Sequence, residues 1–352
     1  MGNTTFALLF SLTGMVVYLY LLNHHLFALT DGVPKLVSCL FVLLLFVFIL
    51  PIIVYLVGPQ WPLPHIVAFL LLLTLCGELR RFFRRVKYKG LAPVERKGPK
   101  LSLLKPVTTY QLLSLRYEIP CPHIGQTTLR TVLLSDFHIN ERTAPELYER
   151  AFAMAQEAKP DILIFGGDYL GPLSMKDDLQ RLAASVKGSL GTFGVIGNHD
   201  HWFNRDEIVE TLKDAGVDML GNSHRILKNH DGEEILVGGC ETPWHKEQWQ
   251  ALKENLPPLR IIASHTPDNV FHLAQESKAT LVLSGHTHAG QGRIPGYGSA
   301  IIPSVHGRLF DHGHFVVDST HLVVSAGVGV QIPLRIYCQP DVTIVDLVPE
   351  KF

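Results

Sequence analysis

Residues able to bind metal ions occur after a series of short apolar segments in this chain. They are carboxylates, imidazoles and one carboxamide, and they comprise Asp136, His138, Asp168, Asn198, His265, His286 and His288. Imidazole together with carboxylate oxygen suits manganese, iron, zinc or nickel better than copper. Seven ligands exceed the needs of one ion. They fit two divalent ions about 3.5–4 Å apart, the spacing that holds the entering and leaving oxygens of a phosphoryl displacement.

Each motif has an ordinary structural alternative. The Asp-x-His sequence at residues 136–138 is weak evidence for a metal site, because it is often a turn residue followed by a surface histidine. Gly-Asp at 167–168 is weaker evidence still. Gly-Asn-His-Asp at 197–200 and Gly-His-Thr-His at 285–288 are more specific. The complete set in this order favours a metal site over chance occurrence.

The elements that must position these residues are short buried strands. Apolar runs of four or five residues cover 131–135, 161–165, 193–196, 261–264 and 281–284. This is the length of a fully buried strand. Helical segments are expected at 144–158 and 176–187. Since ligands gather at the carboxyl ends of strands in layered α/β folds, we expect one common site in a domain spanning residues 126–352.

The N-terminal quarter has a different composition. Uncharged apolar runs cover residues 5–22 and 36–57, and a shorter run covers 62–77. A spanning helix needs roughly 20 apolar residues, so we expect a transmembrane anchor over residues 1–89 with about three membrane runs. A cleaved signal peptide fits poorly because no basic segment precedes the first run and further runs follow it. A proline-rich linker is expected at 90–125.

The charges around these runs predict an orientation. Six basic residues follow the third run, whereas the loop at 58–63 has no charge; the six are Arg80, Arg81, Arg84, Arg85, Lys87 and Lys89. The positive-inside rule then places the following domain in the cytoplasm. The basic segment could also lie on an anionic leaflet as an amphipathic collar, or act as a topology signal alone.

The ordered motifs resemble those of the calcineurin-like metallophosphoesterase superfamily over residues 130–350. The matching segments are Ser135-Asp136-Phe137-His138, Gly166-Gly167-Asp168, Gly197-Asn198-His199-Asp200, Ser264-His265-Thr266-Pro267-Asp268 and Gly285-His286-Thr287-His288-Ala289-Gly290-Gln291. The resemblance implies an α/β four-layer sandwich, in which two mixed sheets are flanked by helices.

The resemblance also implies roles for these residues. Asp136, His138, Asp168 and His288 would hold one ion, and Asp168, Asn198, His265 and His286 the other, with Asp168 bridging. His199 would contact the substrate phosphate, and Asp200 would orient its ring. The two divalent ions are expected to be manganese, with iron, zinc or nickel as alternatives.

Further segments look like the bacterial membrane-associated branch of this superfamily. One departure is Ala326, where the branch usually has arginine; Arg335 or Arg293 could substitute for it. The branch includes a UDP-2,3-diacylglucosamine pyrophosphatase of lipid A synthesis, which releases UMP and the lipid monophosphate. We therefore expect a lipid-linked substrate at the inner membrane. Aromatic residues at 202–203, 244–249 and 303–315 could line an acyl groove, or could be core residues.

Other functions remain as alternatives. They are a membrane-associated phosphodiesterase of another substrate, an inactive phosphoesterase-like binding module, and a transporter with an attached domain. A net charge of −1 and the lack of a basic stripe disfavour a nuclease, so no nucleic-acid partner is expected. The five cysteines show no pair spacing, neither of a disulfide framework nor of a zinc finger, and the lack of a disulfide framework fits a reducing compartment.

Overall fold

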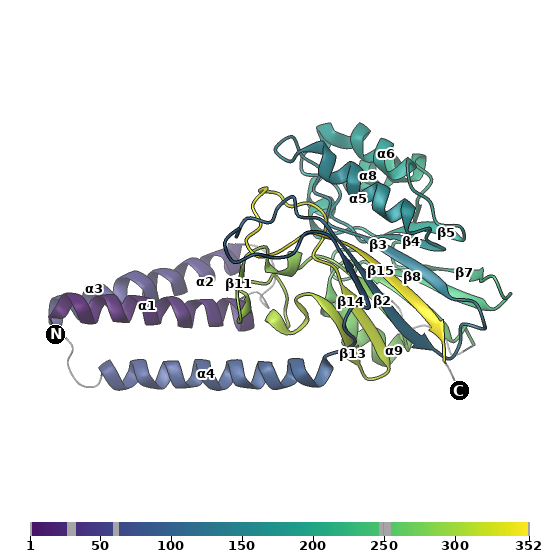
Figure 1. Ribbon diagram of the computed structural model, residues 1–352. Coiled ribbons are helices and arrows are strands. Elements are labelled where there is room, and N and C mark those ends of the chain that lie inside the picture. Colours follow the sequence, from purple (N-terminus) through teal and green to yellow (C-terminus); the bar gives the residue numbers. More distant parts are fainter. Residues whose placement is uncertain (1, 27–32, 59–62, 246–248, 250–254, 351–352) are drawn as a thin grey trace. The chain divides into compact units, whose positions relative to one another are not determined.

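The computed structural model describes residues 2–26, 33–58, 63–245, 249 and 255–350, in two compact units (Figure 1). Unit 1 contains residues 1–87 together with 300–310, and unit 2 contains residues 88–299 and 311–352. The association of residues 300–310 with unit 1 differs from the predicted boundaries, which placed this segment within the phosphoesterase domain. Each unit is described separately below.

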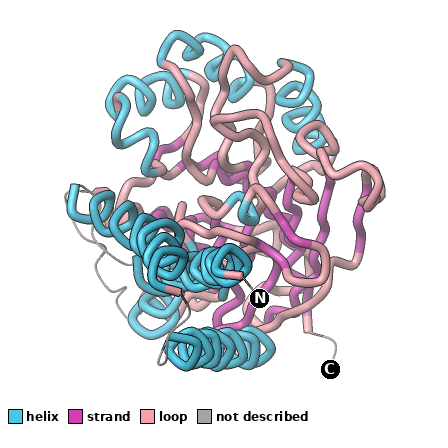
Figure 2. Tube along the Cα trace, turned by 90° about the vertical axis from the view of Figure 1, so that its left-hand side faces the viewer, coloured by secondary structure: helices cyan, strands magenta, loops and turns pink. Residues whose placement is uncertain are grey.

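Helices in unit 1 contain the apolar runs. They are α1 (Asn3–Leu21), the π-helical turn η1 (Leu22–Leu26), α2 (Val33–Leu43), the π-helical stretch η2 (Leu44–Ile49), α3 (Leu50–Val57) and α4 (Leu63–Tyr88). Among the described residues, two helices, Asn3–Leu21 and Val33–Val57, are long and apolar enough to cross a membrane. Helix α4 joins the third apolar run to the basic segment without a break. Figure 2 views these helices nearly end-on.

Close helix packing in unit 1 depends on small residues. Helix α1 packs along η2 and α3. A Cβ atom on Gly14 of α1 would collide with the Phe46 carbonyl, so glycine permits this approach of the two backbones. The π-helical stretch η2 lies directly before Pro51. In a regular α-helix the proline ring would collide with the carbonyl four residues earlier, and the wider π-helical turn avoids this collision. Of the predicted charge-free loop at 58–63, residues 59–62 lie outside the described residues.

Unit 2 contains two mixed sheets. The first has the order β1-β2-β15-β3-β4-β5-β6, with β1 Glu95–Lys97, β2 Leu113–Cys121, β15 Asp341–Pro349, β3 Leu129–Leu134, β4 Ile162–Phe165, β5 Gly191–Gly194 and β6 Asp218–Met219. The second has the order β13-β14-β10-β9-β8-β7, with β13 Gly313–Val317, β14 Thr320–Val324, β10 Leu281–Ser284, β9 Leu259–Ser264, β8 Glu234–Cys240 and β7 His224–Lys228. A short hairpin joins β11 (Arg293–Ile294) and β12 (Gly298–Ser299).

Helices cover the outer faces of these sheets. In Figure 1, three helices lie together on the first sheet: α5 (Pro145–Glu157), α6 (Lys176–Ala184) and α8 (Arg205–Asp214). Helix α9 (Val270–Ser277) packs on β13 and β14 of the second sheet. One buried core lies between the two sheets, and another lies between the first sheet and its helices. The predicted α/β sandwich of two mixed sheets flanked by helices is confirmed.

The strands before the candidate ligands lie near the centres of the sheets. Strands β3, β4 and β5 pair in parallel, as do β9 and β10, and all are buried. The segment at 90–125, predicted as a linker and entry segment, contains β2, an interior strand of the first sheet. The prolines in this segment argue against a strand. Pro120 is tolerated in β2 because it lies beyond the residues that pair with β1, where this edge of the strand has no partner among the described strands.

Candidate metal centre

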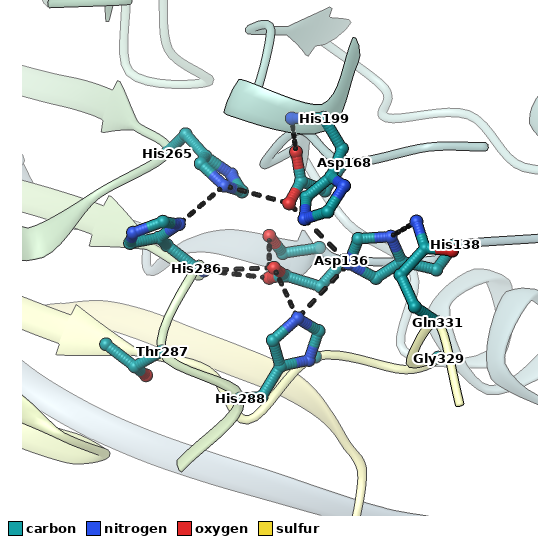
Figure 3. Close-up of polar contacts among 12 residues, drawn as sticks. Asp136, His138, Asp168, His199, His265, His286, Thr287, His288, Gly329 and Gln331 are labelled. Carbon is teal, nitrogen blue, oxygen red and sulfur yellow. Dashed lines mark hydrogen bonds and ion pairs between the residues drawn. The ribbon is translucent and has the colours of Figure 1, made fainter. Parts of the chain in front are cut away.

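The loops at the carboxyl ends of five strands bring the predicted ligands together (Figure 3). Asp136 and His138 follow β3, and Asp168 follows β4. Asn198 begins the short helix α7 (Asn198–Phe203) after β5. His265 directly follows β9, while His286 and His288 follow β10. Residues up to 152 positions apart therefore meet because parallel strands end at the same edge of a sheet.

Backbone strain is concentrated in these loops. Positive φ angles occur at Asp136 (53°), His138 (43°), Asp168 (58°), His286 (68°) and His288 (47°). A left-handed residue other than glycine is uncommon, and such residues gather at functional sites where surrounding contacts fix them. Here the Asp136 N–H donates to the Gly167 carbonyl at 2.9 Å, and the His138 N–H donates to the Asp168 carbonyl at 3.0 Å. The loops after β3 and β4 thus hold each other in place.

Asp168 lies at the centre of the cluster. Its Oδ2 atom is 3.5 Å from Nε2 of His138 and 3.4 Å from Nε2 of His265. The two imidazoles approach this one oxygen from different strands, and all three side chains are buried. A carboxylate placed in this way can serve two neighbouring ions.

Two further groups of ligand atoms surround this carboxylate. On one side, His288 Nε2 is 3.1 Å from His138 Nε2 and 3.5 Å from Asp136 Oδ1. On the other side, His286 Nδ1 is 3.2 Å from His265 Nε2. Asn198 lies beside Asp168, because the next residue in the chain, His199, donates its backbone N–H to Asp168 Oδ1 at 2.9 Å. Six of the seven predicted ligands therefore fall into close three-residue groups, and Asn198 adjoins them.

The donor chemistry fits divalent metal ions. Burial lowers the pKa of His138 to about 3 and also lowers the pKa of His288, so both imidazoles are neutral and have lone pairs available. The Nε2 atoms of these two histidines face each other at 3.1 Å, and a cation bound by both would stabilise this arrangement of lone pairs. The Oδ1 atom of Asn198 is buried without a hydrogen-bond partner among the described residues, as expected for an oxygen that binds a metal ion.

The electrostatics of the second group also favour positive charge. Burial alone would lower the pKa of His265, but the carboxylates of Asp168 and Asp136 raise it to about 9. The Nδ1 atom of His265 lies 2.7 Å from the Gly166 carbonyl and is its natural N–H donor. That bond leaves Nε2 directed toward Asp168, the arrangement by which outer hydrogen bonds fix a metal-binding histidine.

His199 lies beside the ligands, but Asp200 does not orient it as predicted. The Asp200 carboxylate accepts the backbone N–H groups of Gly197, Asp168 and Tyr169 at 3.0, 2.7 and 2.8 Å. Nδ1 of His199 has no hydrogen-bond partner among the described residues. Asp200 is the third residue of α7, so its carboxylate accepts the Gly197 amide at the helix start and the Asp168 and Tyr169 amides of the loop after β4. It supports the Asp168 loop instead of the imidazole.

The sequence analysis missed Gln331, which contacts a predicted ligand. Its Nε2 atom, as placed, is 2.9 Å from Nδ1 of His138 (Figure 3). If Nε2 of His138 binds a metal ion, Nδ1 carries the proton, and the amide oxygen of Gln331 must face it. No motif signalled Gln331, since it lies 193 positions from His138.

The two arginines suggested as substitutes at Ala326 have other partners. Arg335 is fully buried and donates through Nη2 to the carbonyls of Ala326, Gly327 and Gly329. Arg293 pairs with Asp311 at 3.1 Å. That suggestion is therefore wrong, because both guanidinium groups are used to hold loops. Arg335 acts on the site indirectly. It holds the turn at residues 326–329, and the N–H of Gly329 in this turn donates to the Asp136 carbonyl.

The predicted aromatic segments divide into surface and core. Trp202 and Phe203 are 54% and 53% exposed, and their rings lie 5.1 and 6.1 Å from that of His199. The Trp244 ring lies 5.6 Å from that of His265. By contrast, Trp249 is buried and donates to Ser277, and residues 246–248 lie outside the described residues. Of segment 303–315, the phenylalanines are buried.

Comparisons with known proteins agree with this site. The profile of the calcineurin-like phosphoesterase family matches residues 129–290. Phosphodiesterase YaeI of Escherichia coli is 31% identical over 235 residues, which cover 62% of this chain and 82% of that protein. An uncharacterized metallophosphoesterase of Bacillus subtilis, YkuE, is 28% identical over 64% of this chain and 81% of its own length.

A third relative is named as a transmembrane protein. A transmembrane protein with metallophosphoesterase domain from Danio rerio is 28% identical over 64% of this chain and 55% of its own length. Its name and the two apolar helices both associate this chain with a membrane. The profile match, the 31% identical relative and the ordered motifs lead to one conclusion. This chain belongs to the calcineurin-like phosphoesterase family and is a metal-dependent hydrolase of phosphate esters.

Proposed function

We propose that the chain hydrolyses a phosphodiester or pyrophosphate bond in a lipid-linked substrate, with its catalytic unit in the cytoplasm at the inner membrane. The first candidate is UDP-2,3-diacylglucosamine, in which water would split the pyrophosphate into UMP and the lipid monophosphate. The seven ligands Asp136, His138, Asp168, Asn198, His265, His286 and His288 would hold two divalent ions, manganese first. When bound, these ions supply Lewis acidity and lower the pKa of water.

The residues of the chain would position and polarise the substrate. Asp168 holds its neighbours through Oδ2 and would join the two halves of the centre. Burial lowers the pKa of His199, so its neutral imidazole can donate one hydrogen bond to a phosphoryl oxygen as charge develops there. Trp202 and Phe203, exposed beside His199, offer stacking or apolar contact to the group attached to the phosphate.

An exposed apolar rim next to the ligand loops carries the proposal of a lipid-linked substrate. The rim consists of Leu103, Leu104, Val107, Ile332, Leu334 and Ile336, all exposed, with Leu104 at 93%. Val107 and Ile336 form a backbone bridge that joins its two segments. Gln291 donates to the carbonyls of Ile332 and Leu334, and Gln331 contacts His138. Exposed apolar surface of this kind is typical of membrane or lipid contact.

A second candidate is hydrolysis of another phosphodiester, in agreement with the name of the Escherichia coli relative, a phosphodiesterase. Release of UMP from UDP-2,3-diacylglucosamine by detergent-solubilised protein with manganese should be compared with release from UDP-N-acetylglucosamine. Buried methylenes contribute up to about 0.8 kcal/mol each, so we expect a much higher catalytic efficiency on the acylated substrate. Equal efficiency on both would reject the lipid assignment.

A rim variant separates lipid contact from catalysis. We expect the double change Ile332→Ser and Leu334→Ser to lower efficiency on the acylated substrate and to leave bis(p-nitrophenyl) phosphate hydrolysis unchanged. Ile226→Ser is a matched control, because Ile226 is similarly exposed but lies on β7. Loss of activity on both substrates in the rim variant would mean that the rim supports the fold of the centre.

A further inference from the structure

A cavity within unit 1 is lined mainly by cationic and hydrogen-bonding side chains. Its volume is about 280 Å³, and its polar lining consists of Tyr20, His25, Arg80, Arg81, Arg84 and His306. Tyr20 comes from α1 and the arginines from α4, whereas His306 comes from the segment at 300–310. The cavity is therefore formed by three separate stretches of sequence and shares no lining residue with the metal centre.

Hydrogen bonds fix the walls of this cavity. Asn23 donates to the Ala300 carbonyl at 2.9 Å and accepts the Ile302 N–H at 2.9 Å. Arg85 donates to the carbonyls of Arg308 and Leu309. The segment at 300–310 is thus tied to both α4 and the end of α1. Such ties keep the lining residues in place without a ligand.

Tyr20 lies against α4 at Gly77. A Cβ atom on Gly77 would collide with the Tyr20 hydroxyl, so glycine lets the phenol take its present position. The rings of Tyr20 and His25 lie 6.2 Å apart in an edge arrangement. The phenol and imidazole consequently face the arginine side of α4.

The charge of the lining is positive overall. Glu78 accepts from Arg81 at 2.8 Å and also pairs with Arg308. Within the part of the chain that the structure describes, Arg80 and Arg84 have no carboxylate partner. These two residues are four apart, so their side chains emerge from the same face of α4. Guanidinium groups presented together in this way suit a phosphate oxyanion.

The surroundings point to a phosphate that belongs to a lipid. Leu79, Phe82, Phe83 and Val86 alternate with the arginines and are exposed, with Phe83 at 66%. The second half of helix α4 therefore has both apolar and basic side chains on its surface, and it directly follows the apolar first half. Exposed phenylalanines beside arginines are expected where a helix enters the headgroup region of a bilayer. Basic pockets between membrane helices bind anionic headgroups.

We propose that this cavity binds the phosphate headgroup of an anionic phospholipid, through Arg80 and Arg84 with Tyr20, His25 and His306 around them. The bound lipid would link α1, α4 and the segment at 300–310 in the membrane. The proposal is independent of which substrate the metal centre hydrolyses.

Native mass spectrometry of the full chain, released from nanodiscs, tests the proposal. The nanodiscs contain phosphatidylcholine with or without phosphatidylglycerol. We expect the wild type to retain phosphatidylglycerol selectively. The double change Arg80→Gln and Arg84→Gln should weaken this retention by about tenfold or more, because each guanidinium would lose a charge-assisted hydrogen bond to the headgroup phosphate. Arg80→Lys with Arg84→Lys should retain most of it.

The control removes the same charge outside the cavity. Lys87→Gln with Lys89→Gln affects exposed residues that do not line the cavity, so no contact to a bound headgroup is lost and retention should change less than about twofold. Hydrolysis of bis(p-nitrophenyl) phosphate should be normal in all variants, which verifies folding of the catalytic unit. Equal loss in the control, or normal retention in the arginine-to-glutamine variant, would overturn the proposal. Inorganic phosphate alone raising the melting temperature in neutral detergent as much as phosphatidylglycerol would overturn the assignment to lipid.

Discussion

At the scale of single residues, the centre depends on Asp and His side chains held on an unusual backbone. Five of the seven predicted ligands have positive φ, and each lies in a loop that begins at the end of a buried strand. Gly167 permits this crowding, because a Cβ atom there would lie 2.8 Å from Nδ1 of His265. Strain of about 1–3 kcal/mol per such residue is tolerated where the neighbouring loops fix the geometry.

Replacing Asp168 tests the proposed bridge. Asp168→Asn keeps the shape of the side chain and removes its charge, so we expect both ions to be lost and hydrolysis to fall more than about a hundredfold, beyond the effect of an outer contact. Metal content by plasma mass spectrometry and hydrolysis with added manganese measure the two effects. Asn198→Ala should lose mainly one ion. Normal metal content in Asp168→Asn would disprove the bridge.

Gln331 offers a test of the His138 tautomer. If Nδ1 of His138 donates to residue 331, then Gln331→Glu should retain activity because a carboxylate still accepts. Gln331→Leu should lower metal affinity or activity by about 10–100-fold. Isothermal titration with manganese and initial rates compare the two variants. The reverse order, with the glutamate variant the weaker, would show that Nδ1 accepts and that His138 does not bind metal through Nε2.

At the scale of elements, β15 connects the two parts of the first sheet. It pairs in parallel with β2 and antiparallel with β3. Its Asp346 carboxylate accepts from Arg116 of β2 at 2.7 Å and from Arg130 of β3 at 2.7 Å. This ion pair network crosses three neighbouring strands and stabilises the sheet from which the loops of Asp136 and Asp168 extend.

Asp346 should make the free energy of unfolding depend on pH in the acid range. Burial raises the pKa of Asp346, but the hydrogen bonds from Arg130 and Arg116 outweigh this and leave the pKa below its usual range. The stabilisation is therefore complete above the unfolded pKa, about 3.9, and is lost as the pH falls through the lower folded value.

Asp346→Asn should accordingly lower stability by about 2 kcal/mol at neutral pH, a value reduced because both arginines are partly exposed. Thermal unfolding followed by near-ultraviolet circular dichroism should show the loss, and the difference from wild type should shrink at the acid end. Asp318→Asn, in an exposed turn, is the control. An unchanged melting temperature at pH 7 would contradict the network's role.

At the scale of the whole molecule, the chain joins a membrane unit to a catalytic unit. Helix α4 carries four arginines and Lys87 at its end, and Lys89 follows in a backbone bridge to Phe315. The positive-inside rule predicts a cytoplasmic position for such a segment. The proposed topology takes α4 as the third span and therefore expects the loop at 58–63 on the opposite side of the membrane.

Reporter fusions test this topology. Green fluorescent protein at the C-terminus should fluoresce, whereas alkaline phosphatase at the same position should be inactive. Fusions after Gly58 should give the opposite pattern. Active alkaline phosphatase at the C-terminus would place the centre outside the cytoplasm and remove cytoplasmic nucleotide-linked lipids as substrates.

The sequence by itself determined the chemistry of the centre and the core strands that carry it. Metal ions are bound by a small set of side-chain types, here Asp, His and Asn, and buried parallel strands are short apolar runs, so both leave local patterns. The sandwich fold and the family followed from those patterns. The ligand positions could be predicted because each lies within four residues of the end of its own strand.

Only the tertiary structure decided which residues support these ligands. Gln331 meets His138 across 193 positions, Arg335 holds the Ala326–Gly329 turn, and Asp200 binds backbone amides instead of the His199 ring. The segment at 300–310 joins Asn23 across more than 270 positions. Such contacts arise from chain packing, and a hydrogen bond to a backbone group leaves little trace in residue type. Local patterns therefore cannot reveal them, whereas strand and metal chemistry can be read directly.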